Sequence, residues 1–218
     1  MGLGSATARH LLFLPGFLTP AGAYRQLLAP VAAAGTAVTV PQLYRPSPAV
    51  LMGRFTTSDE AQAAVALTRG LGDGGAQVFL GGHSRGGQAA WLAAQQLRKQ
   101  GIQINGLLLL DPVDGGNPRS PQRVATARPT DFGFEPLIIG AGAGGKCAPA
   151  AVNHEWFAKA VAHSRHVVID GMGHADVLNG VTGDLARRLC GGSTLIPHEA
   201  REQVSALFME YIEEHDSG

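Results

Sequence analysis

The sequence predicts a single α/β domain over residues 1–218, with a mostly parallel sheet of about six strands and helices on both faces. Three observations predict this fold class. Short apolar runs alternate with segments of helical periodicity along the chain. The runs are almost continuous in Val, Ile and Leu, which is typical of parallel strands that are buried on both faces. Neither an internal repeat nor a linker divides the chain, and its length suits one domain.

The first elements follow this alternation closely. His10–Leu14 is an apolar run that ends at Pro-Gly, so it is expected to be a buried strand that leads into a loop. Ala21–Ala34 has helical spacing, and the glycine after it suits a helix C-cap. Thr36–Val40 is short and β-branched, which predicts a second strand. Thr57 and Glu60 have the spacing of a capping box, which predicts a helix that starts there and runs to about residue 70.

The same alternation continues to the end of the chain. Four further apolar runs are expected to be strands, and three Ala-rich or 3.6-periodic segments are expected to be helices. Between the fourth and fifth strands, the polar segment Asp114–Phe134 has neither pattern and is expected to be an irregular excursion. The strands are Ala76–Leu80, Ile104–Leu110, Pro136–Ile139 and His166–Ile169, and the helices are Gln88–Gln100, Asn153–His163 and Pro197–His215.

Composition argues against several classes of function. Lys and Arg number 17, as do Asp and Glu, and no basic stripe exists, so a nucleic-acid partner is not expected. No stretch approaches the roughly 20 apolar residues of a membrane-spanning helix. Cys147 and Cys190 are too few for a disulfide framework and are expected to be either free thiols or one bridge. No cluster of metal ligands is present, so neither a metal nor a cofactor is expected.

The third strand runs directly into Gly82-His83-Ser84-Arg85-Gly86, which fits the G-x-S-x-G pattern of a nucleophile elbow. In this turn the serine must sit on a very tight bend between strand and helix, and only glycine two residues away on either side leaves room for the backbone. An apolar strand before it and an Ala-rich helix after it are the context that the α/β-hydrolase fold requires. Ser84 is therefore the predicted nucleophile, whereas His83 is expected to be held by the turn and to point elsewhere.

The predicted general base is His174. In α/β-hydrolases the chain order is nucleophile, acid, base, and loops at the carboxyl edge of the sheet converge on the nucleophile. Of the eight histidines, His174 alone lies in a loop directly after the final strand, and flanking glycines let that loop fold back toward Ser84. His154 is the only rival.

The acid is expected at the end of the fourth strand. The loop 140–152 after the fifth strand, which is the usual position, contains neither Asp nor Glu. Asp111 ends the fourth strand and can reach the imidazole from the neighbouring crevice, with Asp114 as the alternate. Asp170 and Asp176 are too near His174 in sequence to orient it easily.

These groups predict cleavage of an ester through an acyl-enzyme. His174 takes the proton of Ser84 as the hydroxyl attacks, and Asp111 holds the imidazole tautomer and stabilises its charge. Backbone N–H groups of Arg85 and of Phe17, in the first loop, are expected to bind the oxyanion.

The segment Gly82–Gly87 resembles the hallmark GHSRGG of the chlorophyllase family. Four further blocks between residues 13 and about 178 resemble that family as well, although its members more often have His at the position of Pro15. Those members usually carry two more N-terminal strands, which are not visible here, and little or no cap domain is expected. The four blocks are Phe13–Phe17, Leu110–Gly115, Cys147–Pro149 with Val152–His154, and Gly173–Asp176.

The resemblance implies hydrolysis of the phytyl ester of chlorophyll to chlorophyllide and phytol, and the same chemistry could apply to pheophytin. It also implies a chloroplast location and peripheral contact with the thylakoid membrane. A tetrapyrrole with a long alkyl chain needs a broad apolar cleft, for which Leu18, Tyr44, Met52 and Phe55 lie at the predicted active edge. Two alternatives stay open, namely a general carboxylesterase or lipase, and a pigment carrier on an inactive hydrolase scaffold.

Overall fold

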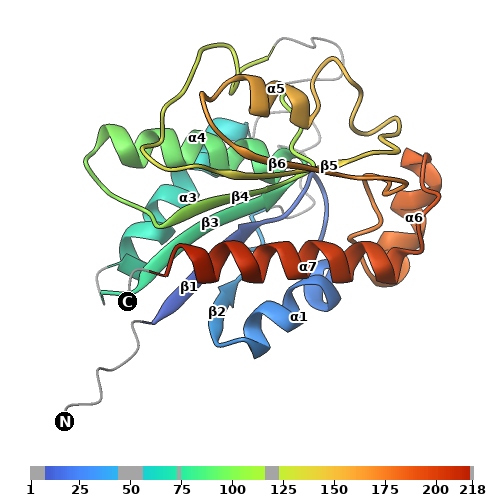
Figure 1. The fold of residues 1–218 in the computed structure, drawn as a ribbon, viewed down its shortest axis with the longest axis horizontal. Helices are drawn as coiled ribbons and strands as arrows, with labels where there is room; N and C mark the ends of the chain where they lie inside the picture. The colour runs from blue at the N-terminus through green and yellow to red at the C-terminus, as the bar shows by residue number, and fades with distance from the viewer. Residues whose placement is uncertain (1–7, 44–55, 73–74, 116–122, 217–218) are drawn as a thin grey trace.

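The computed structural model describes residues 8–43, 56–72, 75–115 and 123–216 of the chain. Six parallel strands of this part form one sheet in the order β2-β1-β3-β4-β5-β6 (Figure 1). The predicted α/β fold with a sheet of about six strands is therefore confirmed. The strands are β1 (Arg9–Leu14), β2 (Thr36–Thr39), β3 (Gln77–His83), β4 (Gly106–Leu110), β5 (Leu137–Ala141) and β6 (Arg165–Ile169).

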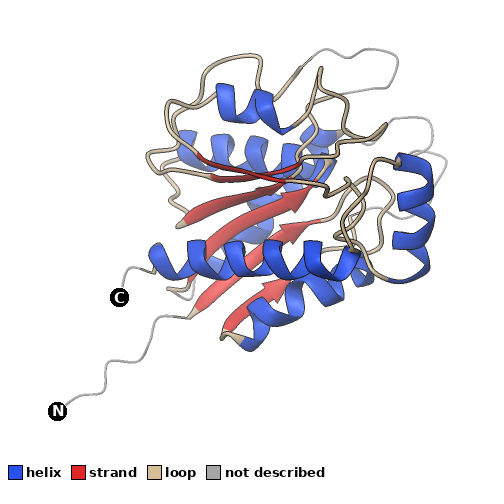
Figure 2. Cartoon of the chain, turned by 45° about the vertical axis from the view of Figure 1, so that its right-hand side comes forward, coloured by secondary structure: helices blue, strands red, loops and turns tan. Residues whose placement is uncertain are grey.

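Helices cover both faces of the sheet (Figure 2). One face packs on α1 and α7, and the other on α3, α4 and α5, so that two apolar cores form. Strand β1 shows the alternation that this requires, since Leu11 and Phe13 enter the first core whereas Leu12 and Leu14 enter the second. The helices are η1 (Ala21–Tyr24, a 3₁₀ turn), α1 (Arg25–Ala33), α3 (Thr57–Gly72), α4 (Arg85–Lys99), α5 (His154–Lys159), α6 (Gly180–Cys190) and α7 (Pro197–Glu214).

The start of α3 differs from the prediction. The capping box is formed one residue earlier, where the N–H and the hydroxyl of Thr56 each donate to Asp59 Oδ2 at 2.7 Å and the Asp59 N–H donates to Thr56 Oγ1 at 3.3 Å. Thr57 instead donates to the side chain of Gln88 on α4, and Glu60 is fully buried. The predicted pair was wrong because both of its side chains face the neighbouring helix.

Helix α6 was not predicted from the sequence. Its apolar side chains Val181, Leu185 and Leu189 are exposed, so they do not mark a face that packs on the core. Two glycines also lower its helical propensity. The helix begins where Asn179 accepts a hydrogen bond from Gln26 N and donates one from its own N–H to Ala23 O, which joins it to η1 and α1.

The two cysteines form a disulfide, Cys147–Cys190, and no free cysteine exists among the described residues. The bridge joins the segment after β5 to the last residue of α6, and the Lys146 N–H donates to the carbonyl of Cys190 beside it. Of the two possibilities that the sequence left open, the structure therefore has the single bridge.

Candidate active site

Ser84 is the only residue between the end of β3 and the start of α4, and its backbone is left-handed, with φ 56° and ψ −124°. The turn is as tight as the glycine pattern predicts. A Cβ on Gly82 would lie 2.3 Å from the carbonyl oxygen of Gly86, and one on Gly86 would lie 2.2 Å from that of Leu14. Because these neighbours are backbone atoms that cannot rotate away, only glycine fits at either position.

Asp111 and His174 are buried and in direct contact at the carboxyl edge of the sheet. His174 Nδ1 lies 2.6 Å from Asp111 Oδ2, and the N–H of Ala141 donates to Asp111 Oδ1 at 3.1 Å. Burial raises the pKa of Asp111, but the hydrogen bond and charge of His174 and the Ala141 N–H outweigh it, so that the pKa is lowered. The carboxyl group is therefore ionised at neutral pH and holds the Nδ1 edge of the imidazole.

The carboxylate of Asp114, the alternate acid, serves the irregular segment that follows β4. It is fully buried and accepts five hydrogen bonds. The donors are the N–H groups of Val124, Ala125 and Thr126, the Thr126 hydroxyl and the Gln88 amide. Both carboxylate oxygens are thus engaged in holding this segment against α4.

Asp176 shapes the loop that carries His174. Its Oδ2 accepts a hydrogen bond from the Gly173 N–H at 2.7 Å and one from the Ser193 hydroxyl at 2.6 Å. This contact within the loop agrees with the expectation that an aspartate so close in sequence to His174 does not orient its imidazole.

The sequence had led us to expect that His83 points away from the site, but the structure places it against His174. Its ring centroid lies 4.6 Å from that of His174, and its Nε2 lies 2.9 Å from the His174 carbonyl oxygen. Its Nδ1 lies 2.8 Å from the hydroxyl of Tyr24. Burial, followed by the charge of His174, lowers the pKa of His83 to about 3, so the ring is neutral at pH 7.

His154, the rival base, pairs with another histidine. Its Nδ1 lies 2.8 Å from His166 Nε2, and its ring lies against Gly140, where a Cβ would come within 2.4 Å of it. Burial lowers the pKa of both rings. The structure thus places His174, and not His154, in hydrogen-bond contact with Asp111.

The two residues predicted to donate to the oxyanion lie beside one another. The first loop lies against the elbow, since a Cβ on Gly16 would be 3.4 Å from Ser84 Cβ. The Arg85 guanidinium lies 5.4 Å from the ring centre of Phe17, and its Nε forms an ion pair with Glu60 Oε1 at 2.5 Å. Sequence reasoning missed this ion pair, because it assigned Glu60 to a capping box with Thr57.

Of the four residues predicted to line a pigment cleft, one lies in the described part of the chain. Leu18 is exposed in the first loop, next to Phe17, and has a left-handed backbone with φ 52°. Tyr44, Met52 and Phe55 lie outside the described residues. Among the residues that the structure describes, no group of three or more His, Cys, Asp or Glu side chains could hold a metal ion.

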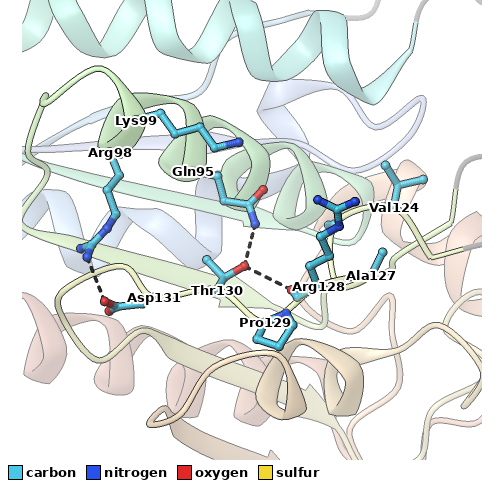
Figure 3. Close-up of a pocket in the computed structure, with 10 residues that line it drawn as sticks. Gln95, Arg98, Lys99, Val124, Ala127, Arg128, Pro129, Thr130 and Asp131 are labelled. Atoms are coloured by element: carbon cyan, nitrogen blue, oxygen red, sulfur yellow. Dashed lines mark hydrogen bonds and ion pairs between the residues drawn. The ribbon is translucent and has the colours of Figure 1, made fainter.

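A cavity of about 590 Å³ lies between α4 and residues 124–131, and Figure 3 shows side chains that line it. Gln95 donates to Thr130 Oγ1 at 2.7 Å and Arg98 to Asp131 at 2.9 Å across it, so the cavity is a seam where the irregular segment docks on the helix. Gln95 is three turns along α4 from Ser84, about 16 Å at the rise of an α-helix. The cavity is therefore separate from the Asp111–His174 site.

In this parallel sheet, strand β3 is followed by a serine with a left-handed backbone and then directly by a helix. This arrangement is typical of the α/β-hydrolase fold. The model of the chlorophyllase family matches residues 6–217. The chain therefore belongs to the chlorophyllase family, and it is a carboxylic ester hydrolase.

Solved structures show the same fold at low sequence identity. A metagenome-derived lipolytic enzyme, from work on LipS and LipT, is 18% identical with a TM-score of 0.59, over 84% of this chain and 92% of that one. A thermophilic esterase from Thermogutta terrifontis is 16% identical with a TM-score of 0.61, over 98% and 92%. The type II thioesterase YbtT of the yersiniabactin pathway is 14% identical with a TM-score of 0.61, over 99% and 96%. No match was found among the curated proteins.

Proposed function

We propose that this protein hydrolyses the phytyl ester of chlorophyll to chlorophyllide and phytol, with Ser84 as nucleophile, His174 as base and Asp111 as acid. The same chemistry would apply to pheophytin. Membership of the chlorophyllase family supports the substrate. The observation that carries the mechanism is the 2.6 Å contact between Asp111 and His174 Nδ1 at the sheet edge where Ser84 turns into α4.

The contact sets the tautomer of the base. Asp111 is ionised and can only accept, so Nδ1 of His174 carries the proton and Nε2 keeps its lone pair. Nε2 takes the proton of Ser84 as Oγ attacks the ester carbonyl carbon. When the tetrahedral intermediate collapses, the C–O bond to the alcohol breaks and His174 returns the proton to phytol. Water then attacks the acyl-enzyme by the same route and releases the chlorophyllide carboxylate.

The N–H groups of Arg85 and Phe17 would stabilise the oxyanion in both steps. Arg85 is the first residue of α4 and directly follows Ser84, which is the position that supplies one oxyanion donor in a nucleophile elbow. The helix dipole adds a positive end at the same place. Loss of one such donor typically costs about 3 kcal/mol in the transition state.

A labelling and turnover experiment tests the proposal. A fluorophosphonate probe should label the wild type and the control Ser164→Ala, whose serine precedes β6, but not Ser84→Ala. Wild-type enzyme in detergent should convert chlorophyll a to chlorophyllide. If short nitrophenyl esters are hydrolysed but chlorophyll is not, the result would support a general carboxylesterase or lipase instead. Pigment binding that leaves the probe unreacted would indicate the carrier.

We also propose a chloroplast location and contact with the thylakoid membrane through α6. No helix of the described residues is long and apolar enough to cross a membrane. On α6, however, Val181, Leu185 and Leu189 are 84%, 57% and 65% exposed, and their spacing of four residues puts them on one face. Arg188 is exposed on the same helix, and an apolar stripe with a cation beside it fits an anionic lipid surface.

Flotation with vesicles of phosphatidylcholine, with and without phosphatidylglycerol, tests this contact. Leu185→Glu should reduce the bound fraction, whereas Leu67→Glu, on α3, should not. Equal binding of both variants would contradict the assignment to α6. In that case the stripe has no part in membrane contact.

A further inference from the structure

A buried chain of three hydrogen bonds connects the first loop to the loop of His174. The Gly16 N–H donates to the Tyr24 hydroxyl oxygen at 2.8 Å, and that hydroxyl lies 2.8 Å from His83 Nδ1. His83 Nε2 lies 2.9 Å from the carbonyl oxygen of His174. The side chains of Tyr24, His83 and His174 are all buried, and the mechanism above uses neither Tyr24 nor His83.

Only one arrangement of protons gives each of these three hydrogen bonds one donor and one acceptor. The His174 carbonyl can only accept, so Nε2 of His83 must carry the proton that is donated to it. Nδ1 of the neutral ring is then an acceptor, and the Tyr24 hydroxyl donates to it. The Tyr24 oxygen in turn accepts from Gly16. Burial lowers the pKa of His83 to about 3 and raises the pKa of Tyr24, so both groups stay neutral over a wide pH range.

The two ends of this series of hydrogen bonds lie in the two loops that must be placed most accurately for catalysis. Gly16 precedes Phe17, the proposed oxyanion donor, and lies against Ser84. The other end is the backbone of His174, the proposed base. A shift of about 1 Å in such groups can lower a rate about 100-fold. His83 itself is held between them, because it is the last residue of β3 and directly precedes Ser84.

We propose that His83 is a positioning residue, which holds the loop of His174 through Nε2–H and the first loop through Nδ1 and Tyr24. This inference rests on the proposed function, since it assigns His83 to the placement of the proposed base and oxyanion donor. It predicts that the two ring nitrogens have separable roles. The bond from Nε2–H to the His174 carbonyl is the one that acts on the base.

Two substitutions separate these roles. In His83→Gln the side-chain amide can reach the place of Nε2 and donate to the His174 carbonyl, whereas in His83→Asn it reaches only the place of Nδ1. For p-nitrophenyl butyrate we expect kcat of His83→Gln within about threefold of the wild type and kcat of His83→Asn lowered about 100-fold, with KM nearly unchanged in both. Tyr24→Phe, which keeps the bond to His174, should lower kcat by about tenfold.

Equal losses in the Gln and Asn variants, or no loss in either, would overturn the proposal. Histidine ¹⁵N spectra of the wild type provide a check that needs no variant, because His83 should be the neutral Nε2–H tautomer at pH 7. Observation of the Nδ1–H tautomer would also overturn it. Ser84→Ala and His174→Ala serve as separate controls. If they remain active, the proposed function fails whatever the His83 variants do.

Discussion

The sharpest test of the site is Asp111→Asn, because the structure determines how the new amide must orient. The Ala141 N–H donates to Oδ1 at 3.1 Å, so that position requires an oxygen. The amide NH₂ of the asparagine must then occupy the Oδ2 position, 2.6 Å from His174 Nδ1 in the wild type. Since this group donates, Nδ1 becomes the acceptor and the proton moves to Nε2. An imidazole in that tautomer cannot take the proton of Ser84.

The expected loss is large. In serine hydrolases with a Ser-His-Asp triad, the equivalent change lowers kcat about 10⁴-fold through the wrong tautomer, which corresponds to about 5 kcal/mol in the transition state. The assay is steady-state hydrolysis of p-nitrophenyl butyrate by protein whose folded fraction is measured by circular dichroism. KM should change little, because the proposed role of Asp111 is to act on the base and not on the bound ester.

Asp114→Asn is the matched control. Its carboxylate accepts five hydrogen bonds from the irregular segment and α4, so an NH₂ group there faces at least one donor without an acceptor. We expect a loss of about 2–3 kcal/mol in the free energy of unfolding, with kcat of the folded enzyme nearly unchanged. The reasoning is refuted if Asp111→Asn keeps kcat within about tenfold of the wild type, or if both variants lose activity alike.

Three other predictions concern the stability of the site. Gly86→Ala would place its Cβ 2.2 Å from a backbone carbonyl oxygen of β1, so we expect a loss of about 4 kcal/mol or more, whereas Gly22→Ala meets nothing within 4 Å; equal melting temperatures would contradict this. Burial lowers the pKa of His83 to about 3, so between about pH 3 and pH 6.5 the unfolded chain binds a proton at His83 that the folded chain does not. The contribution of His83 to the free energy of unfolding is therefore fully present above pH 6.5 and decreases as the pH falls toward 3. In urea titrations between pH 7 and pH 5, the free energy of unfolding should fall by about 2 kcal/mol more in the wild type than in His83→Gln. Equal decreases in the two proteins would count against this prediction. Removing the Cys147–Cys190 bridge, whose cysteines are 43 residues apart, should lower the free energy of unfolding by about 4 kcal/mol, and an unchanged melting temperature of the double Ser variant would refute this.

Much of the fold could be predicted from the sequence because its signals are local. Apolar runs indicated every strand of the described sheet, and helical periodicity, Ala-rich composition or a capping pattern indicated the helices that pack on the core. The exceptions follow the same logic. Helix α6 exposes Val181, Leu185 and Leu189 to solvent. Helix α3 starts from a capping box of Thr56 and Asp59, one residue before the predicted pair. In both cases the residue pattern did not show which side chains pack on the rest of the protein.

The turn at Ser84 is the part of the site that the sequence determined by itself. Gly82 and Gly86 are required by contacts within a few residues and with the adjacent strand, and their spacing from the serine is visible in the chain. The identities of Asp111 and His174 as candidates also followed from chain order and from the ends of strands. Their catalytic roles remain a proposal that the variants above would test.

Only the tertiary structure decided which side chains meet. Asp111 and Asp114 are three residues apart. The pairing of β4 with β5 brings Asp111 to the Ala141 N–H, and the pairing of β5 with β6 brings the loop of His174 to the same edge. The pairing of the cysteines, the ion pair of Glu60 with Arg85 and the contacts of His83 were decided in the same way. Each joins segments that are far apart in the chain, and a hydrogen bond or ion pair depends on distances of tenths of an ångström. Residue type and spacing do not carry such distances, which come from how the sheet and its loops pack.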